Sequence, residues 1–559
     1  MDYDALVEVY ADLEATEADS ALVETIEGVL ASAEEETLRL LVTLLRGRPF
    51  VAWDDRDLGV SSSLTRQAIA KATGHSEDQI EAWWRETGDL GSAGAKAVES
   101  ERQQTLFTQS LSVGDVQATL ERIATLEGPG SQQRRVEEIA GLLADADPQA
   151  AKYLVRTVLE NLRIGVGEGA IRDAIAGAFL DGSDEAIEAV QRAYQVTNDF
   201  REVAETARAA GREGLTSMKI RVGRPIDVML AEKAESIEAG IESVAEEREA
   251  VLAEYKYDGV RAQIHIDDGQ ITIFTRRLAD VTEQFPDVVR AVESQVNADR
   301  AILEAELLAY DPGTGETRPF QTLSKRIERK YDVEEMAAEI PVTAACFDAV
   351  YLEESLLDEP LERRLEALNR ILEAAPREIE RAANRRTGDP AELEAFYEAA
   401  LDDGQEGIML KNSAATYQPG SRVGYMVKVK PTLETLDLVV SRATYSEGRR
   451  SNQLGRLYLA CRGENNQFWE VGRLSTGFTD EQLAEVTAKL KPLITDTQGR
   501  DVDLEPALVL EVEFEELQQS PEYDSGYALR FPRFVGFRED LGPGDVDTLQ
   551  RIESLYDQQ

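Results

Sequence analysis

The spacing of apolar residues changes twice along the chain. Up to about residue 215 apolar side chains recur three and four positions apart, as at Leu6, Tyr10 and Leu13, which is the pattern of amphipathic helices. Farther on, alternating segments are mixed with helical ones such as Leu361 to Leu372. After Leu436 short alternating segments recur between turns and predict β-strands.

These patterns predict a multidomain protein. A chain of 559 residues exceeds what one hydrophobic core usually serves. We expect an all-α domain over residues 1–215, an α/β or α+β domain over 216–430, and a small β-barrel over 431–559. The barrel segment includes one predicted helix near Glu481 to Leu490.

A hairpin is predicted at Ile264 to Ile273, where Asp-Gly forms the two-residue turn. This turn fixes the register, and continuing the register beyond the hairpin places Arg261 opposite Arg276. Two cations that face each other across strands are destabilising. Either an anion such as a phosphate binds beside them, or neighbouring acids neutralise them, and the pairing alone favours neither.

Two acids, Glu304 and Glu306, lie on one face of an otherwise apolar strand. A buried charge needs a partner. A divalent ion bound to phosphates would provide one, and so would a nearby lysine or arginine. In a chain this acidic, a solvated strand face is a rival explanation, and this segment alone is weak evidence.

Charge and lysine content single out one residue. The chain has 107 acids against 60 bases and a net charge of −47, yet 42% of its residues are apolar, which argues against disorder. Only 13 of the basic residues are lysines, and Lys256 lies between Glu254 and Asp258. An arginine cannot replace a lysine as a nucleophile, because the guanidinium stays protonated. Lys256 is therefore our candidate covalent catalyst.

Three other lysines share the segments in which acids and glycines gather. They are Lys411, Lys428 and Lys430. Period-two spacing directs Lys428 and Lys430 to one face of a strand. Four of 13 lysines in these few segments is an uneven distribution for a chain that otherwise uses arginine.

Several classes of site and location are excluded by composition. Two cysteines rule out a four-thiolate zinc site, and two histidines rule out most histidine-based catalysis. The N-terminus is acidic, without the basic start of a signal peptide, and no apolar run reaches membrane-spanning length. We expect a cytoplasmic protein with no membrane partner.

Together the segments resemble, in order and spacing, the motifs of the covalent nucleotidyltransferases, which are DNA ligases, RNA ligases and mRNA capping enzymes. The motifs are Lys256-Tyr257-Asp258-Gly259, Thr275-Arg276-Arg277, Glu304-Ala305-Glu306, Cys346-Phe347-Asp348, Glu406-Gly407 and Lys428-Val429-Lys430. The segments Arg530 to Phe534 and Arg538 to Asp540 resemble the last motif of ATP-dependent DNA ligases of the archaeal and eukaryotic replicative type. The helical part resembles their DNA-binding domain, notably at Leu162 to Glu168.

The resemblance implies a role for each matching residue. Lys256 would form lysyl-AMP, with Glu254 reading adenine and Phe347 stacking on it. Residues expected to contact the ribose or phosphates of ATP are Arg261, Arg276, Glu306, Arg422, Lys428 and Lys430. Glu306 and Glu406 would bind Mg²⁺ or Mn²⁺. Arg530, Arg538 and Asp540 would serve pyrophosphate in a C-terminal OB-fold, although Leu541 stands where the family usually has lysine.

For the chemistry, attack requires an uncharged amine. We expect neighbouring cations such as Lys428, together with the metal, to lower the pKa of Lys256. The implied reaction seals nicks in duplex DNA through lysyl-AMP and DNA-adenylate, in replication, repair and recombination. The acidic, lysine-poor composition resembles that of proteins from a halophilic archaeon.

Partners and rival functions follow from the same resemblance. Nicked duplex DNA is the expected partner, and we expect a monomer. Gln103 to Phe107 resembles a shortened sliding-clamp motif, with a helix turn packed inside the domain as the alternative. An RNA ligase or capping enzyme is the nearest rival, and the large helical region argues against it. A non-catalytic nick-binding scaffold is disfavoured by the intact Lys256, and an NAD-dependent ligase by the absence of a cysteine-rich zinc module.

Overall fold

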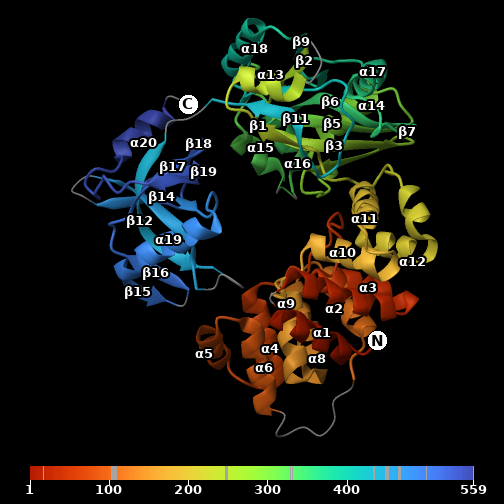
Figure 1. The fold of residues 1–559 in the computed structure, drawn as a ribbon, viewed down its shortest axis with the longest axis vertical. Helices are drawn as coiled ribbons and strands as arrows, with labels where there is room; N and C mark the ends of the chain where they lie inside the picture. The colour runs from red at the N-terminus through yellow and green to blue at the C-terminus, as the bar shows by residue number, and fades with distance from the viewer. Residues whose placement is uncertain are drawn as a thin grey trace. The chain divides into compact units, whose positions relative to one another are not determined.

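The computed structural model describes residues 1–16, 18–101, 110–245, 250–327, 329, 331–431, 435–446, 452–463, 467–498 and 500–557 (Figure 1). The segment Gln103 to Phe107, with its expected clamp motif, lies outside the described residues. Contacts divide the chain into two compact units. The first comprises Met1–Ile80 and Gly91–Lys430, and the second comprises Glu81–Leu90 and Pro431–Gln559.

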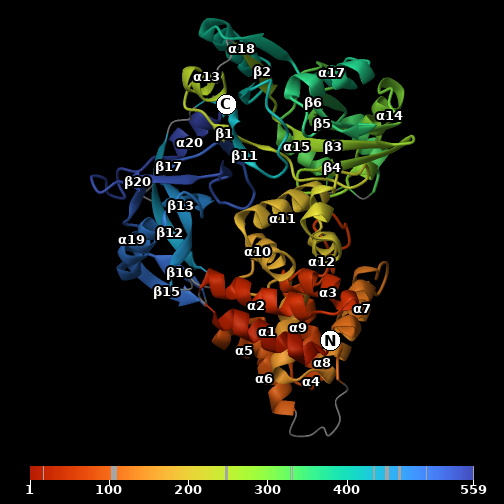
Figure 2. The ribbon, with the colours of Figure 1, turned by 45° about the vertical axis from the view of Figure 1, so that its right-hand side comes forward.

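The N-terminal part is helical, as the apolar spacing predicts. Its helices are α1 (Tyr3–Ala15), α2 (Asp19–Ser32), α3 (Glu35–Leu45), α4 (Ser62–Thr73), α5 (Glu77–Thr87), α6 (Leu90–Glu101), α7 (Val113–Ala124), α8 (Ser131–Asp145), α9 (Pro148–Val158), α10 (Glu168–Phe179), α11 (Asp184–Thr197) and α12 (Phe200–Thr216). Leu6, Tyr10 and Leu13 of α1 are all buried. Figure 2 shows α11 and α12 between the earlier helices and strands β3 and β4.

The middle part contains two sheets. The strands of the five-stranded sheet, in spatial order, are β1 (Leu230–Lys233), β11 (Arg422–Val429), β10 (Gly407–Lys411), β2 (Val251–Lys256) and β9 (Asn384–Thr387). Those of the six-stranded sheet are β4 (Gln270–Thr275), β3 (Val260–Asp267), β5 (Arg300–Ala309), β6 (Val342–Leu352) and β7 (Glu354–Ser355), with β8 (Ile379–Arg381) paired to β6. The helices are α13 (Ile237–Ala245), α14 (Pro286–Gln295), α15 (Phe320–Ile327), α16 (Val333–Glu339), α17 (Leu361–Ile371) and α18 (Pro390–Asp402).

Each sheet buries one face under helices. Alternate residues of β2, β10 and β11, such as Ala253 and Leu410, pack with Leu393 of α18 and Val244 of α13, and Figure 1 shows these two helices together beside this sheet. The six-stranded sheet packs one face in the same way under α14 and α17. Since side chains alternate across a strand, the opposite faces carry the polar residues of the motifs.

The hairpin register matches the prediction up to its last pair. Ile264 pairs with Ile273, but the ladder ends at Ala262 and Thr275. Arg276 is exposed and belongs to the turn that follows β4. The predicted opposition of Arg261 and Arg276 is therefore wrong, because the chain turns away one residue too early.

The second unit is mostly sheet. Its strands are β12 (Leu436–Tyr445), β13 (Leu454–Arg462), β14 (Phe468–Leu474), β15 (Ile494–Gln498), β16 (Asp501–Leu504), β17 (Val509–Glu513), β18 (Glu516–Gln519), β19 (Tyr527–Arg530) and β20 (Arg533–Phe537), and its helices are α19 (Asp480–Leu490) and α20 (Leu549–Tyr556). β12 pairs with β13, β16 and β17, and β17 pairs with β20. The predicted helix near Glu481 to Leu490 is confirmed as α19. None of the described helices is long and apolar enough to cross a bilayer.

Candidate active site

Strand alternation gathers the motif lysines on one face of the five-stranded sheet. On β2 this face carries Glu254 and Lys256, which pair in register with Met409 and Gly407 of β10. Lys428 of β11 pairs with Met409, and Lys430 follows two residues later. The prediction that Lys428 and Lys430 share a face is consistent with this register.

Two glycines allow the close approach of strands around Lys256. A Cβ atom at Gly259 would lie 2.4 Å from the carbonyl oxygen of Leu307, so only glycine lets β5 pass this close. Gly407 has a φ of 132°, and a Cβ there would lie 2.3 Å from the carbonyl oxygen of Val429. Both glycines sit directly beside the acids and lysines of the site.

Lys256 shares a carboxylate with Lys430. Its Nζ atom lies 3.0 Å from Oε2 of Glu406, and Nζ of Lys430 lies 2.5 Å from the same oxygen. About a quarter of the Lys256 side chain and a fifth of the Glu406 side chain are exposed. We call Lys256, Glu406 and Lys430 the Lys256 cluster.

The pKa of Lys256 moves opposite to the expected direction. Burial by itself lowers it, but the nearby carboxylates of Glu406 and Glu306 more than offset burial, so the pKa is raised. For the acid Glu406 burial acts in the other direction and raises the pKa. Lys256 and Lys430 outweigh burial and bring the pKa of Glu406 to about 2. Among the protein's own groups the acids outweigh the cations, so the expected lowering of the lysine pKa by the metal stays a prediction.

Glu306 completes this surrounding of Lys256. Its backbone pairs with that of Arg261 across β3 and β5. Burial raises its pKa to about 7, although Lys256 and Arg261 act against the rise. A carboxyl with this pKa exchanges a proton readily near neutral pH.

Arg261 and Glu304 neutralise each other on the facing sheet. Arg261 donates to the carboxylate of Glu304 and to the carbonyl oxygen of Met229 at 2.9 Å. The hydroxyl of Tyr417 donates to the other oxygen of Glu304 at 2.6 Å. Of the alternatives left open by the sequence, an arginine partner for the buried acid is the one observed.

Glu254 is buried and paired, with Phe347 close by. Nζ of Lys411 contacts its carboxylate and also lies 4.8 Å from the centroid of the Phe347 ring. The Arg261 guanidinium carbon lies 5.2 Å from the same centroid. Phe347 is only partly buried and has cations beside its ring, so it is not an ordinary core aromatic.

A second buried pair lies behind Glu254. Arg364 of α17 donates to both carboxylate oxygens of Asp348 at 2.9 and 3.0 Å, and both side chains are almost fully buried. Asp348 and Arg364 each affect the pKa of Glu254 electrostatically. We call Glu254, Lys411, Asp348 and Arg364 the Glu254 cluster.

The other predicted residues lie apart from these clusters in sequence or strand position. Arg422 is exposed at the first position of β11, six residues before Lys428, and donates to the carbonyl oxygen of Ala231 at 3.0 Å. Within the second unit, Arg530 pairs with Glu516 at 2.8 Å. Arg538 likewise pairs there with Asp437 at 2.6 Å and with Asp540 at 2.9 Å.

Three residues near the site had no predicted role. They are Lys411, Met409 and Tyr417. Period-two alternation predicts that Gly407, Met409 and Lys411 share one face of β10. No sequence signal, however, indicates that β10 pairs with β2, so the sequence did not bring Met409 and Lys411 to the site. Tyr417 lies in a loop, where alternation gives no information.

The carboxylates present fit a divalent ion only in combination with a substrate. In the described residues, no group of three or more histidines, cysteines, aspartates or glutamates could hold a metal ion. Glu306 and Glu406 both act on Lys256, and Mg²⁺ is commonly held by one or two carboxylates plus substrate phosphates. The two glutamates are therefore sufficient if phosphate oxygens supply the other ligands.

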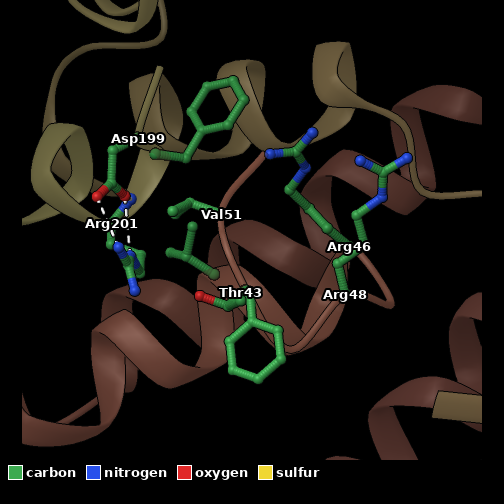
Figure 3. Close-up of a pocket in the computed structure, with 9 residues that line it drawn as sticks. Thr43, Arg46, Arg48, Val51, Asp199 and Arg201 are labelled. Atoms are coloured by element: carbon green, nitrogen blue, oxygen red, sulfur yellow. Dashed lines mark hydrogen bonds and ion pairs between the residues drawn. The ribbon is translucent and has the colours of Figure 1, made fainter. Parts of the chain in front are cut away.

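A small pocket in the helical region contains cations far from these motifs in sequence. It is lined by Arg46, Arg48, Arg201 and six other residues (Figure 3). Arg201 is paired with Asp199 at 2.9 Å and Arg46 with Glu168. Figure 3 shows Arg46 and Arg48 next to each other on the same segment.

Comparison with known proteins identifies the family. A family model described as the ATP dependent DNA ligase domain matches residues 228–430, one described as the DNA ligase N terminus matches 2–176, and one described as the ATP dependent DNA ligase C terminal region matches 450–541. The helical, adenylation and mostly-sheet C-terminal regions therefore follow the three-domain architecture of these ligases. All three matching models are described as parts of DNA ligases.

Full-length relatives agree. The chain is 41% identical over 558 residues to a DNA ligase of Thermococcus fumicolans, and the alignment covers 100% of this chain and 98% of that protein. It is 42% identical over 568 residues to a DNA ligase of Nanoarchaeum equitans (strain Kin4-M), with 100% and 99% covered. The solved structure Pmar-Lig_PreS3 resembles the fold with a TM-score of 0.57 at 16% identity, covering 95% of this chain and 99% of that one. The chain belongs to the family of ATP-dependent DNA ligases.

Proposed function

We propose that this protein seals nicks in duplex DNA, using ATP to form first lysyl-AMP and then DNA-adenylate. One observation carries the proposal for the first step. Lys256 lies on a polar sheet face with Glu406 at 3.0 Å, and Glu306 and Asp258 also act on it electrostatically.

In the first step Nζ of Lys256 attacks the α-phosphorus of ATP. An N–P bond forms, the bond to the bridging oxygen breaks, and pyrophosphate leaves. The ammonium must lose its proton beforehand, because only the uncharged amine can attack. Glu406, with its pKa of about 2, stays ionised and holds Lys256 and Lys430 in place.

The remaining site residues position the nucleotide. We assign Glu254 and Phe347 to the adenine and Arg261, Arg276, Arg422, Lys428 and Lys430 to the ribose and phosphates. Glu306 and Glu406 would hold Mg²⁺ or Mn²⁺, and the ion would neutralise charge on the phosphates. Catalysis of such transfers depends mostly on positioning and charge neutralisation.

The later steps transfer AMP to the 5′-phosphate at a nick, after which the adjacent 3′-hydroxyl displaces it. Residues 1–215 would bind the duplex, with the exposed Arg48 of the helical pocket available to a phosphate (Figure 3). Residues 216–430 would form the adenylation domain and 431–559 an OB-fold. A barrel is supported by an isolated bridge between Thr476, beyond β14, and Arg533 of β20.

In the C-terminal region Arg530, Arg538 and Asp540 would assist pyrophosphate in the first step. We further propose a cytoplasmic monomer that works in replication, repair and recombination. The net charge of −47 is compatible with DNA binding at high salt. At molar ionic strength the repulsion between the protein's acids and the DNA phosphates is screened beyond ~3 Å. A clamp partner would bind at Gln103 to Phe107.

The test uses α-labelled ATP followed by unlabelled nicked DNA. Wild-type protein should take up one label that is acid-labile and alkali-stable, as a P–N bond requires, and pass it to the nick, while Lys256→Ala and Lys256→Arg take up none. Removal of residues before Thr216 should leave labelling intact and abolish sealing. Label that never leaves the protein, or that passes only to RNA ends, would contradict the proposal.

A further inference from the structure

Within the part of the chain that the structure describes, Lys411 is the side chain that contacts both the acid and the aromatic ring assigned to adenine. It lies on β10 opposite Leu252, diagonally beside Glu254 on the same sheet face. Its Nζ atom contacts the Glu254 carboxylate and lies 4.8 Å from the ring centroid of Phe347. One buried ammonium, 7% exposed as a residue, therefore fixes both groups.

The bond to Lys411 leaves acceptor capacity on Glu254. Lys411 donates to Oε2 of Glu254, and Oε1 accepts no hydrogen bond from the described residues. An ionised carboxylate only accepts hydrogen bonds, whereas a protonated one also donates. Adenine presents an amino donor at position 6, while guanine presents a carbonyl acceptor there. The charge state of Glu254 is thus a means of telling the two purines apart.

Lys411 is the cation that sustains this charge state. Burial raises the pKa of Glu254, and Lys411 counters the rise more strongly than Arg364 does. The other groups facing Glu254 are Asp348 of β6, which adds to the rise, and Tyr257 of the segment after β2. Arg364 is already matched by Asp348 at 2.9 Å, so it cannot replace Lys411.

We propose that Lys411 is a positioning residue that sets the purine preference of the adenylation site. Its ammonium keeps Glu254 a charged acceptor beside Phe347, which favours the 6-amino group of adenine over O6 of guanine. The inference rests on the proposed function, since it assumes that the site transfers a nucleotide to Lys256. Lys411 touches neither Lys256 nor its carboxylates, and so it acts through Glu254.

The test measures covalent labelling of Lys256 by α-labelled ATP and by α-labelled GTP. In Lys411→Met the ratio of kcat/KM for ATP to that for GTP should fall by about tenfold or more, because a hydrogen-bonding site loses its match to the preferred group. In this variant ATP labelling should rise with pH as Glu254 ionises, while GTP labelling falls. Lys411→Arg keeps a cation and should keep most of the preference.

A double variant makes the test independent of folding. Lys411→Met alone leaves a buried acid without its partner, whereas Lys411→Met with Glu254→Gln leaves no charge at either position and should unfold near the wild-type temperature. Because Lys411 acts through Glu254, the double variant should lose no more preference than Glu254→Gln alone. Effects that multiply, or an unchanged ratio in Lys411→Met, would overturn the inference. Wild-type protein that takes no label from ATP would instead overturn the proposed function.

Discussion

The two clusters of the adenylation site handle charge in different ways. In the Glu254 cluster two cations are matched by two anions, and no side chain exceeds 8% exposure. In the Lys256 cluster one carboxylate holds two ammonium groups, and the exposures are 25%, 21% and 15%. In the first arrangement every charged group is buried with its partner, while in the second the charged groups are partly exposed to solvent.

This difference separates two demands on one sheet face. Breaking a buried pair leaves an uncompensated charge that strongly destabilises the fold. A shared, partly exposed carboxylate can release one of its cations when a phosphate arrives, at much smaller cost. We infer that the Glu254 cluster keeps the sheet face in shape and that the Lys256 cluster rearranges during the reaction.

The largest expected effect is on stability, from Arg364→Met. This change leaves Asp348 buried without its two hydrogen bonds at 2.9 and 3.0 Å. We expect the free energy of unfolding to fall by about 3–5 kcal/mol. Denaturant unfolding of purified protein measures it.

The neighbouring arginine supplies a matched control. Arg363 pairs with Glu366 at 2.8 Å, but both side chains are 65% exposed. Arg363→Met should change the free energy of unfolding by less than about 1 kcal/mol. If the two variants were equally stable, burial would not distinguish the Glu254 cluster from surface pairs.

The next effect is on catalysis, from Glu406→Gln. The amide no longer holds Lys256 and Lys430 by charge, and it is a poor ligand for a divalent ion. We expect self-adenylation to slow by about 100-fold, or about 2.7 kcal/mol in activation free energy, while stability changes by only about 1 kcal/mol. Single-turnover labelling with ATP and denaturant unfolding give the two values.

An exposed glutamate of α18, Glu398, serves as the control for this variant. Glu398→Gln should label at the wild-type rate, since it removes the same charge outside the site. A Glu406→Gln protein that labels normally but is severely destabilised would reverse the roles that we assign to the two clusters.

The comparison also shows what the sequence could reveal. Periodicity predicted the helices, the sheets and the register from Ile264 to Ile273, since these depend on residues close in the chain. The scarcity of lysine singled out Lys256, and the cost of burying a charge offered an arginine as a partner for a buried acid. The Arg261–Arg276 opposition was wrong because the end of a ladder depends on where the chain turns, which the register does not contain.

Contacts between distant segments were not predictable in this way. The bond from Lys411 to Glu254 joins strands more than 150 positions apart, and Tyr417 reaches Glu304 from a loop. The rise in the pKa of Lys256 was missed for the same reason, because Glu306 and Glu406 approach it from distant parts of the chain. The roles of the individual site residues remain predictions.

The smallest expected effect concerns a buried histidine whose pKa is shifted by burial alone. His265 lies on the same face of β3 as Arg261, is 1% exposed, and accepts a hydrogen bond from the backbone nitrogen of Gly223 at 3.0 Å. Burial lowers its pKa to about 3. It therefore stays neutral in the folded protein where a free histidine would be charged.

The sign of the pH dependence follows from this lowered pKa. Above a pH of about 6.5 His265 is neutral in both the folded and the unfolded protein, and its contribution to the free energy of unfolding is fully present. As the pH falls below that value, only the unfolded chain takes up the proton, so the folded state loses stability until the pH nears 3. Between pH 7 and pH 5 this amounts to about 2 kcal/mol.

His265→Gln isolates this contribution from the many other titrating acids. The glutamine cannot be protonated, but its amide oxygen can still accept the hydrogen bond from Gly223. Denaturant unfolding at pH 7, 6 and 5 should show the variant losing about 2 kcal/mol less than the wild type over this range. Parallel loss in both proteins would mean that water or a counter-charge reaches His265.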